Sequence, residues 1–112
     1  MAKNGGKVPG LEDELEDKIR QAQDEVRRAQ DGVKSTSKRH EGIQRQADAF
    51  KAGLEKITGE PAPFIAAQAT ALERSAKNSA EDKRRADQES VGADNELADL
   101  MLARDQLKQM RS

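Results

Sequence analysis

Apolar residues recur along the first half of the chain at alternating steps of three and four positions. The run continues in one phase for more than five heptads, from Leu15 to Ile57. Such a repeat is typical of a coiled-coil helix, and it predicts a helix over residues 11–58. Its a positions are Ile19, Val26, Val33, His40, Ala47 and Leu54, and its d positions are Leu15, Ala22, Ala29, Thr36, Ile43, Phe50 and Ile57.

The repeat stops at a segment, residues 58–63, that cannot continue a helix. Gly59 is a residue that commonly ends a helix, and Pro61 and Pro63 lack the backbone N–H that a helix interior needs. Proline suits the first turn of a new helix, so we expect a second helix over 64–111 after a turn at 59–63. Its weaker stripe consists of Ile65, Ala69, Leu72, Ala76, Ser79, Lys83, Ala86, Ser90, Ala93, Leu97, Leu100, Arg104 and Leu107.

The two stripes fit each other if the chain folds back at this turn. Leu15 then opposes Leu107 and Ala29 opposes Ala93, and the numbers of opposed residues always add to 122 or 123. The sequence therefore predicts an all-α protein, a long antiparallel helical hairpin in one domain over 11–112, after a flexible leader over 1–10. Alanine is frequent between the helices and buries little area, so we expect the hairpin to dimerise into a helical bundle.

Two segments of poor helix propensity leave an alternative open. Residues 31–37 and 90–95 are rich in Gly, Ser, Asp and Asn. If both are loops, the chain forms a compact four-helix bundle. The unbroken heptad phase through Val33 and Thr36 favours the continuous hairpin, because a loop has no reason to keep phase.

Composition restricts the class of protein. Charged residues make up 37% of the chain, and twenty Lys and Arg against twenty-one Asp and Glu leave a formal charge of −1. This balance argues against a histone-like basic binder. No apolar run approaches the ~18 residues of a membrane span, and no secretory signal is visible. Cysteine is absent, so cysteine content does not distinguish an oxidising from a reducing compartment. We expect a soluble protein, with the cytoplasm favoured.

Candidate catalytic and metal-binding residues are few. The single histidine, His40, occupies an a position, where we expect it to form a polar layer in the core together with Thr36. The alternative for His40 is a pH switch. There is no cysteine, no paired histidine and no phosphate-binding glycine loop. The sequence therefore predicts a non-enzyme without cofactor, metal or small-molecule substrate.

Charge is distributed in blocks. Residues 11–25 and 87–105 each carry a formal charge of −5, whereas 27–45 carry +4 and 77–85 carry +2. The hairpin would bring the basic blocks together into a basic patch, which could receive nucleic acid or an acidic protein face. No aromatic residue is interleaved for base stacking, so nucleic-acid binding is disfavoured. The patch consists of Arg27, Arg28, Lys34, Lys38, Arg39, Lys83, Arg84 and Arg85.

Apolar residues near the two chain ends are more numerous than a two-helix contact needs. Leu97, Leu100, Met101 and Leu102 fall within six positions, which makes the apolar face wide enough for a third or fourth helix. We therefore predict self-association through Leu11, Leu15, Ile19, Leu97, Leu100, Met101, Leu102 and Leu107.

Three functions follow from these observations. The first is a non-enzymatic scaffold, adaptor or assembly protein that forms a homo-oligomer and binds other proteins. The second is a small regulatory protein, such as an inhibitor or a secretion chaperone, that occludes a partner's surface. The third and weakest is nucleic-acid binding through the basic patch.

Overall fold

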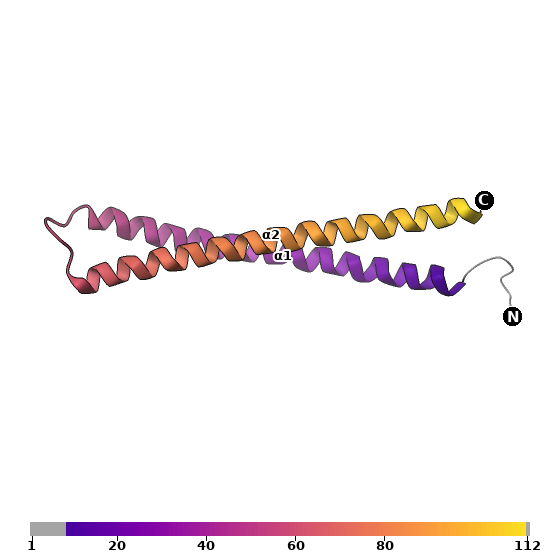
Figure 1. Cartoon of the computed structure of the whole chain (residues 1–112), viewed down its shortest axis with the longest axis horizontal. Helices are drawn as coiled ribbons and strands as arrows, with labels where there is room; N and C mark the ends of the chain where they lie inside the picture. The colour runs from indigo at the N-terminus through magenta and orange to yellow at the C-terminus, as the bar shows by residue number, and fades with distance from the viewer. Residues whose placement is uncertain (1–8, 112) are drawn as a thin grey trace. The chain divides into compact units, whose positions relative to one another are not determined.

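The protein is an all-α helical hairpin, as the heptad pattern predicts. The computed structural model describes residues 9–111, and the predicted leader lies outside them except for Pro9 and Gly10, which belong to the first helix. Helix α1 spans Pro9–Leu54 and helix α2 spans Pro63–Arg111, with no strand among the described residues (Figure 1).

Helix α1 ends at Leu54, four residues before the predicted end. The backbone tightens here: the N–H of Lys56 donates to the Gly53 carbonyl and the N–H of Ile57 to the Leu54 carbonyl, each at 3.1 Å. The chain then reverses at Gly59, whose φ of 86° is readily adopted by glycine. Pro63 begins α2, where its missing N–H costs no hydrogen bond.

Both segments of poor helix propensity are helical, so the four-helix bundle with loops near 31–37 and 90–95 is wrong. In the first segment the Thr36 hydroxyl donates to the carbonyls of Gly32, at 2.7 Å, and Val33, at 3.2 Å. A threonine that bonds back to the preceding turn is compatible with a helix. Packing of a continuous apolar stripe therefore outweighs the poor helix propensity of these two segments.

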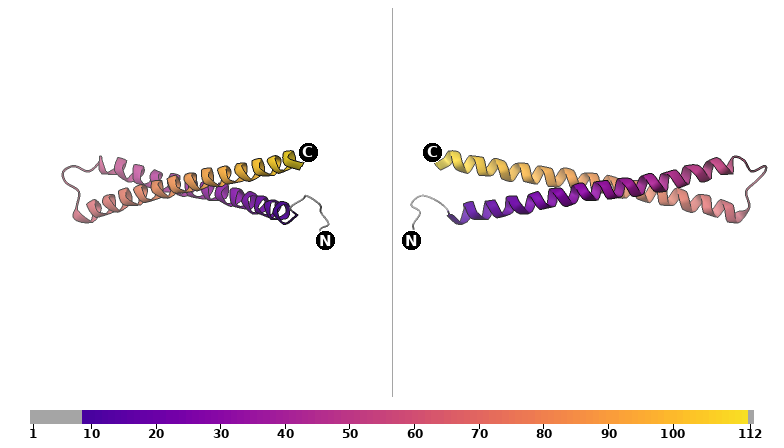
Figure 2. Two further views of the ribbon diagram at one scale, coloured as in Figure 1. Left: turned by 45° about the vertical axis from the view of Figure 1, so that its right-hand side comes forward. Right: turned by 180° about the vertical axis from the view of Figure 1, so that it is seen from behind.

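Tertiary contacts divide the hairpin into two units, each a pair of antiparallel helix segments (Figures 1 and 2). We call residues 9–30 with 88–111 the termini unit, because it contains both ends of the described chain. We call residues 31–87 the turn unit, because it contains the reversal between α1 and α2.

The termini unit holds the buried apolar residues Leu15, Ile19 and Ala22, all from α1, and Ile19 is only 3% exposed. At the outer end of this unit Arg111 forms an ion pair with Glu12 at 2.9 Å. The remaining inward-facing residues are half-buried: Val26, Ala29, Ser90, Ala93, Leu97, Leu100, Arg104 and Leu107.

The turn unit is packed more thinly. Its one buried residue among those described is polar, Ser79, and its inward apolar side chains are half-buried. Ile57 and Phe64, on either side of the turn, are exposed. The half-buried residues of its two stripes are Val33, Thr36, His40, Ile43, Ala47, Phe50, Leu54, Ile65, Ala69, Leu72, Ala76, Lys83 and Ala86.

Candidate protein-interaction surface

The eight residues predicted to mediate self-association fall into two groups. Five of them face the other helix within the termini unit, where they are buried or half-buried: Leu15, Ile19, Leu97, Leu100 and Leu107. The other three, Leu11, Met101 and Leu102, are exposed. Only the exposed group is open to a partner; the first group already stabilises the hairpin.

An apolar outer face lies on α2 of the termini unit. Val91 and Leu102 are 58% and 54% exposed. They are eleven positions apart, which is about three helical turns, so they lie on one side of the helix. Ala98 and Met101 are also exposed and lie within about 100° of them around the helix. We call these four residues the outer face. Val91 was missed by the sequence analysis because it lies off the heptad stripe.

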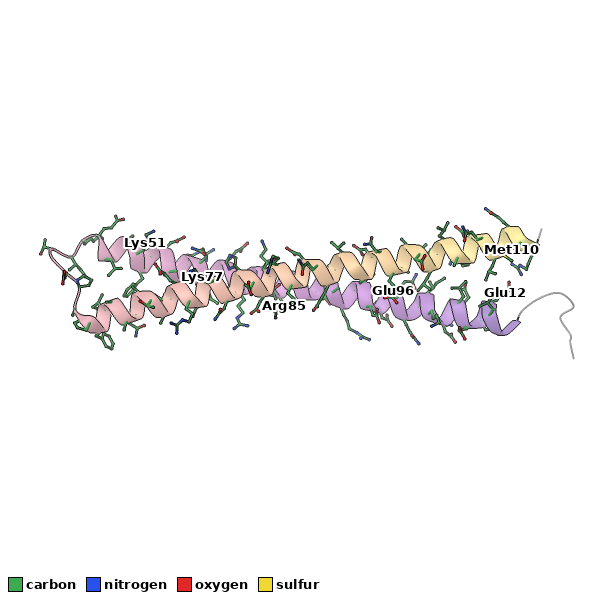
Figure 3. All side chains as sticks on the ribbon, in the orientation of Figure 1. Glu12, Lys51, Lys77, Arg85, Glu96 and Met110 are labelled. Carbon is green, nitrogen blue, oxygen red and sulfur yellow. The ribbon has the colours of Figure 1, made fainter. Side chains whose placement is uncertain are left out.

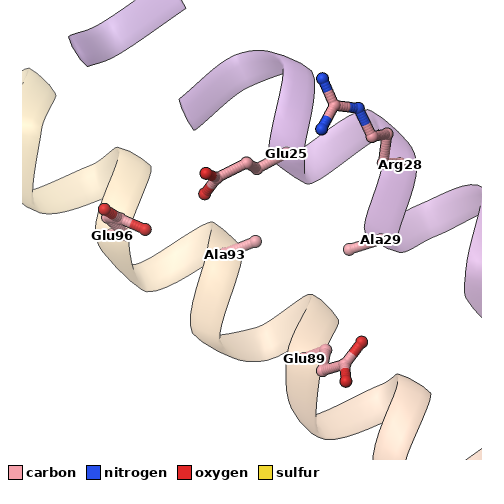
Figure 4. A pocket seen from close by; sticks show the side chains of 6 residues that line it. All are labelled: Glu25, Arg28, Ala29, Glu89, Ala93 and Glu96. Carbon is pink, nitrogen blue, oxygen red and sulfur yellow. The ribbon is translucent and has the colours of Figure 1, made fainter. Parts of the chain in front are cut away.

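A groove of about 400 Å³ is lined in part by Ala29 of α1 and Ala93 of α2 (Figure 4). The two methyl groups face each other, and the carboxylates of Glu25 and Glu96 lie beside them. Glu89 and Arg28 complete the lining. The groove is open to solvent and supplies carboxylates without a nucleophile or a histidine, so its chemistry favours contact with cationic side chains over catalysis.

The residues of the predicted basic patch belong to different units. Arg27 and Arg28 belong to the termini unit, and the other six bases belong to the turn unit. Arg84 lies 3.5 Å from Glu81 and Arg85 lies 3.8 Å from Asp82, each one turn away on α2. Exposed pairs of this kind add little stability. They do reduce the net charge of the patch, which weakens the case for phosphate binding.

The predicted polar layer pairs His40 with Ser79. Nδ1 of His40 lies 2.8 Å from Oγ of Ser79, which is 4% exposed. Since the Ser79 hydroxyl donates to the Ala76 carbonyl at 3.0 Å, its lone pairs are left to accept from the Nδ1–H of His40. Thr36 lies in the same stripe but bonds to its own helix.

Replacing Ser79 with alanine should lower the free energy of unfolding by about 1 kcal/mol relative to Ser75→Ala, because it removes the acceptor for His40. Ser75 is exposed on the same helix, so it controls for the change in helix propensity. The double variant His40→Leu, Ser79→Ala should cost less than the two single changes together. Urea denaturation followed by circular dichroism measures the wild type, the three single variants Ser79→Ala, Ser75→Ala and His40→Leu, and the double variant. Equal effects of Ser79→Ala and Ser75→Ala would contradict this role.

No family model, curated protein or solved structure matches this chain. Between Pro9 and Arg111, no helix is long and apolar enough to cross a membrane. The same part of the chain contains no group of three or more His, Asp or Glu side chains placed to hold a metal ion.

Proposed function

We propose that this protein is a non-enzymatic helical scaffold, adaptor or assembly protein that acts through self-association and protein binding. The observation that supports this proposal is the small number of buried residues. Among the side chains that the structure describes, only Leu15, Ile19, Ala22 and Ser79 are buried. Large apolar side chains such as Val91, Met101 and Leu102 are exposed.

The interior of the hairpin is small, because no side chain among the described residues is fully buried. A pair of helices with so little buried apolar area is marginally stable, so a partner would supply a substantial part of the free energy of folding.

The outer face supports protein binding over other functions. It presents Val91, Met101 and Leu102 to solvent on a continuous helix. Apolar side chains at helical spacing suit packing against another helix. Nucleic-acid binding is less well supported, because the turn unit carries eleven bases but also nine acids.

Size-exclusion chromatography coupled to light scattering tests self-association directly. We expect a mass of two or more chains at micromolar concentration, and helicity that falls on dilution as the assembly dissociates. A folded, stable single chain across the same concentrations would contradict the proposal. That result would instead favour the regulatory protein that occludes a partner's surface.

A further inference from the structure

The two units of the hairpin carry opposite formal charges. The described residues of the termini unit include twelve acids and seven bases, a charge of −5. The turn unit includes nine acids and eleven bases, a charge of +2. Glu12 and Glu96 mark the acidic unit in Figure 3, and Lys51, Lys77 and Arg85 mark the basic one.

These opposite charges are only partly neutralised within their own units. Glu25, Glu89 and Glu96, which line the groove of the termini unit, make no ion pair within 4 Å to another described residue. In the turn unit the same holds for several bases among the residues described: Lys34, Lys38, Arg39, Arg45, Lys51 and Lys77. Each unit therefore presents charge that a partner of opposite sign could neutralise.

Both units also expose apolar side chains. The termini unit has its outer face, and the turn unit has Ile57 and Phe64, the latter 72% exposed. A second copy of the chain therefore offers apolar surface to either unit. It offers opposite charge only when unlike units meet.

We infer that two copies associate with the termini unit of each lying against the turn unit of the other. This inference rests on the proposed self-association. Two-fold symmetry repeats the contact, so a termini unit of formal charge −5 faces a turn unit of formal charge +2 at two places. If like units were in contact, the two termini units would place a charge of −5 against a charge of −5. Charges at the edge of an interface govern orientation more than affinity, and apolar burial supplies most of the binding energy.

Intermolecular paramagnetic relaxation tests the orientation, because the chain has no cysteine of its own. A nitroxide is attached to an Asn95→Cys variant, since Asn95 is exposed on α2 of the termini unit. This protein is mixed with ¹⁵N-labelled wild type that carries no label. We expect broadening of wild-type amides within 31–87. The matched variant Asn78→Cys, in the turn unit, should broaden amides within 9–30 and 88–111.

The outcomes separate this inference from the proposal on which it rests. A two-chain mass with Asn95→Cys broadening amides of the termini unit would overturn the orientation and leave self-association intact. A single-chain mass without intermolecular broadening would overturn both. If the opposite charges set the orientation, raising the ionic strength from about 0.05 to 0.5 M should also raise the dissociation constant several-fold. An unchanged dissociation constant would contradict the electrostatic argument.

Discussion

Replacing Ile19 with alanine should lower the free energy of unfolding by about 2–4 kcal/mol. Ile19 is the most deeply buried large side chain among those described for the termini unit, at 3% exposure. Truncating it removes apolar burial where the hairpin has few other buried residues. Because the total stability of a small domain is only about 5 kcal/mol, we expect a large loss of helicity at 37 °C. Urea denaturation at fixed protein concentration measures the change.

Leu11→Ala is the matched control for this prediction. Leu11 lies on the same helix but is exposed, so its truncation should cost well under 1 kcal/mol. Equal losses for the two variants would mean that the contact between α1 and α2 does not stabilise the hairpin. The comparison should be made at one protein concentration, because self-association contributes to the apparent stability.

Replacing Met101 and Leu102 together with glutamine should weaken self-association about 100-fold while leaving the contact between α1 and α2 unchanged. Both side chains are exposed, so their loss removes apolar area from the partner interface and little from the hairpin. In a symmetric dimer four side chains change, which corresponds to about 3 kcal/mol of lost apolar burial. Glutamine keeps the helix propensity and the charge. Sedimentation equilibrium measures the dissociation constant.

The double variant Gln106→Ala, Gln109→Ala is the control for the outer face. Both residues are exposed on α2 of the same unit, and the change alters neither charge nor buried area. Its dissociation constant should match the wild type. Leu97 is a poor choice for this test, because it is half-buried between the helices and its loss would also destabilise the hairpin. An unchanged dissociation constant for the glutamine variant would show that the outer face is not the interface.

The inward face of each helix could be predicted because the helical period is rigid. Every position of the first stripe from Leu15 to Leu54 is buried or half-buried, and so are the polar members of the second, such as Lys83 and Arg104. A polar residue that is in phase with apolar neighbours faces the other helix as they do, because the helical backbone fixes its position around the helix axis.

The helix end and the interaction surface could not be predicted in the same way. Ile57 keeps the heptad phase, yet local hydrogen bonds near Gly53 end the helix before it. The pattern also cannot separate residues that pack between α1 and α2 from residues that face outward, because both are apolar and close in sequence. Leu100 and Leu102 illustrate this difference: the first is half-buried and the second is exposed.

The hydrogen bond between His40 and Ser79 restricts how the two helices can slide past each other. A shift of one helix by seven residues would exchange one alanine for another at three places, between Ala22 and Ala29, Ala69 and Ala76, and Ala86 and Ala93. A shifted alignment would separate His40 from Ser79 and remove this hydrogen bond, at a cost of about 1 kcal/mol. That cost disfavours shifted alignments, so one polar pair between α1 and α2 favours a single register of the two helices.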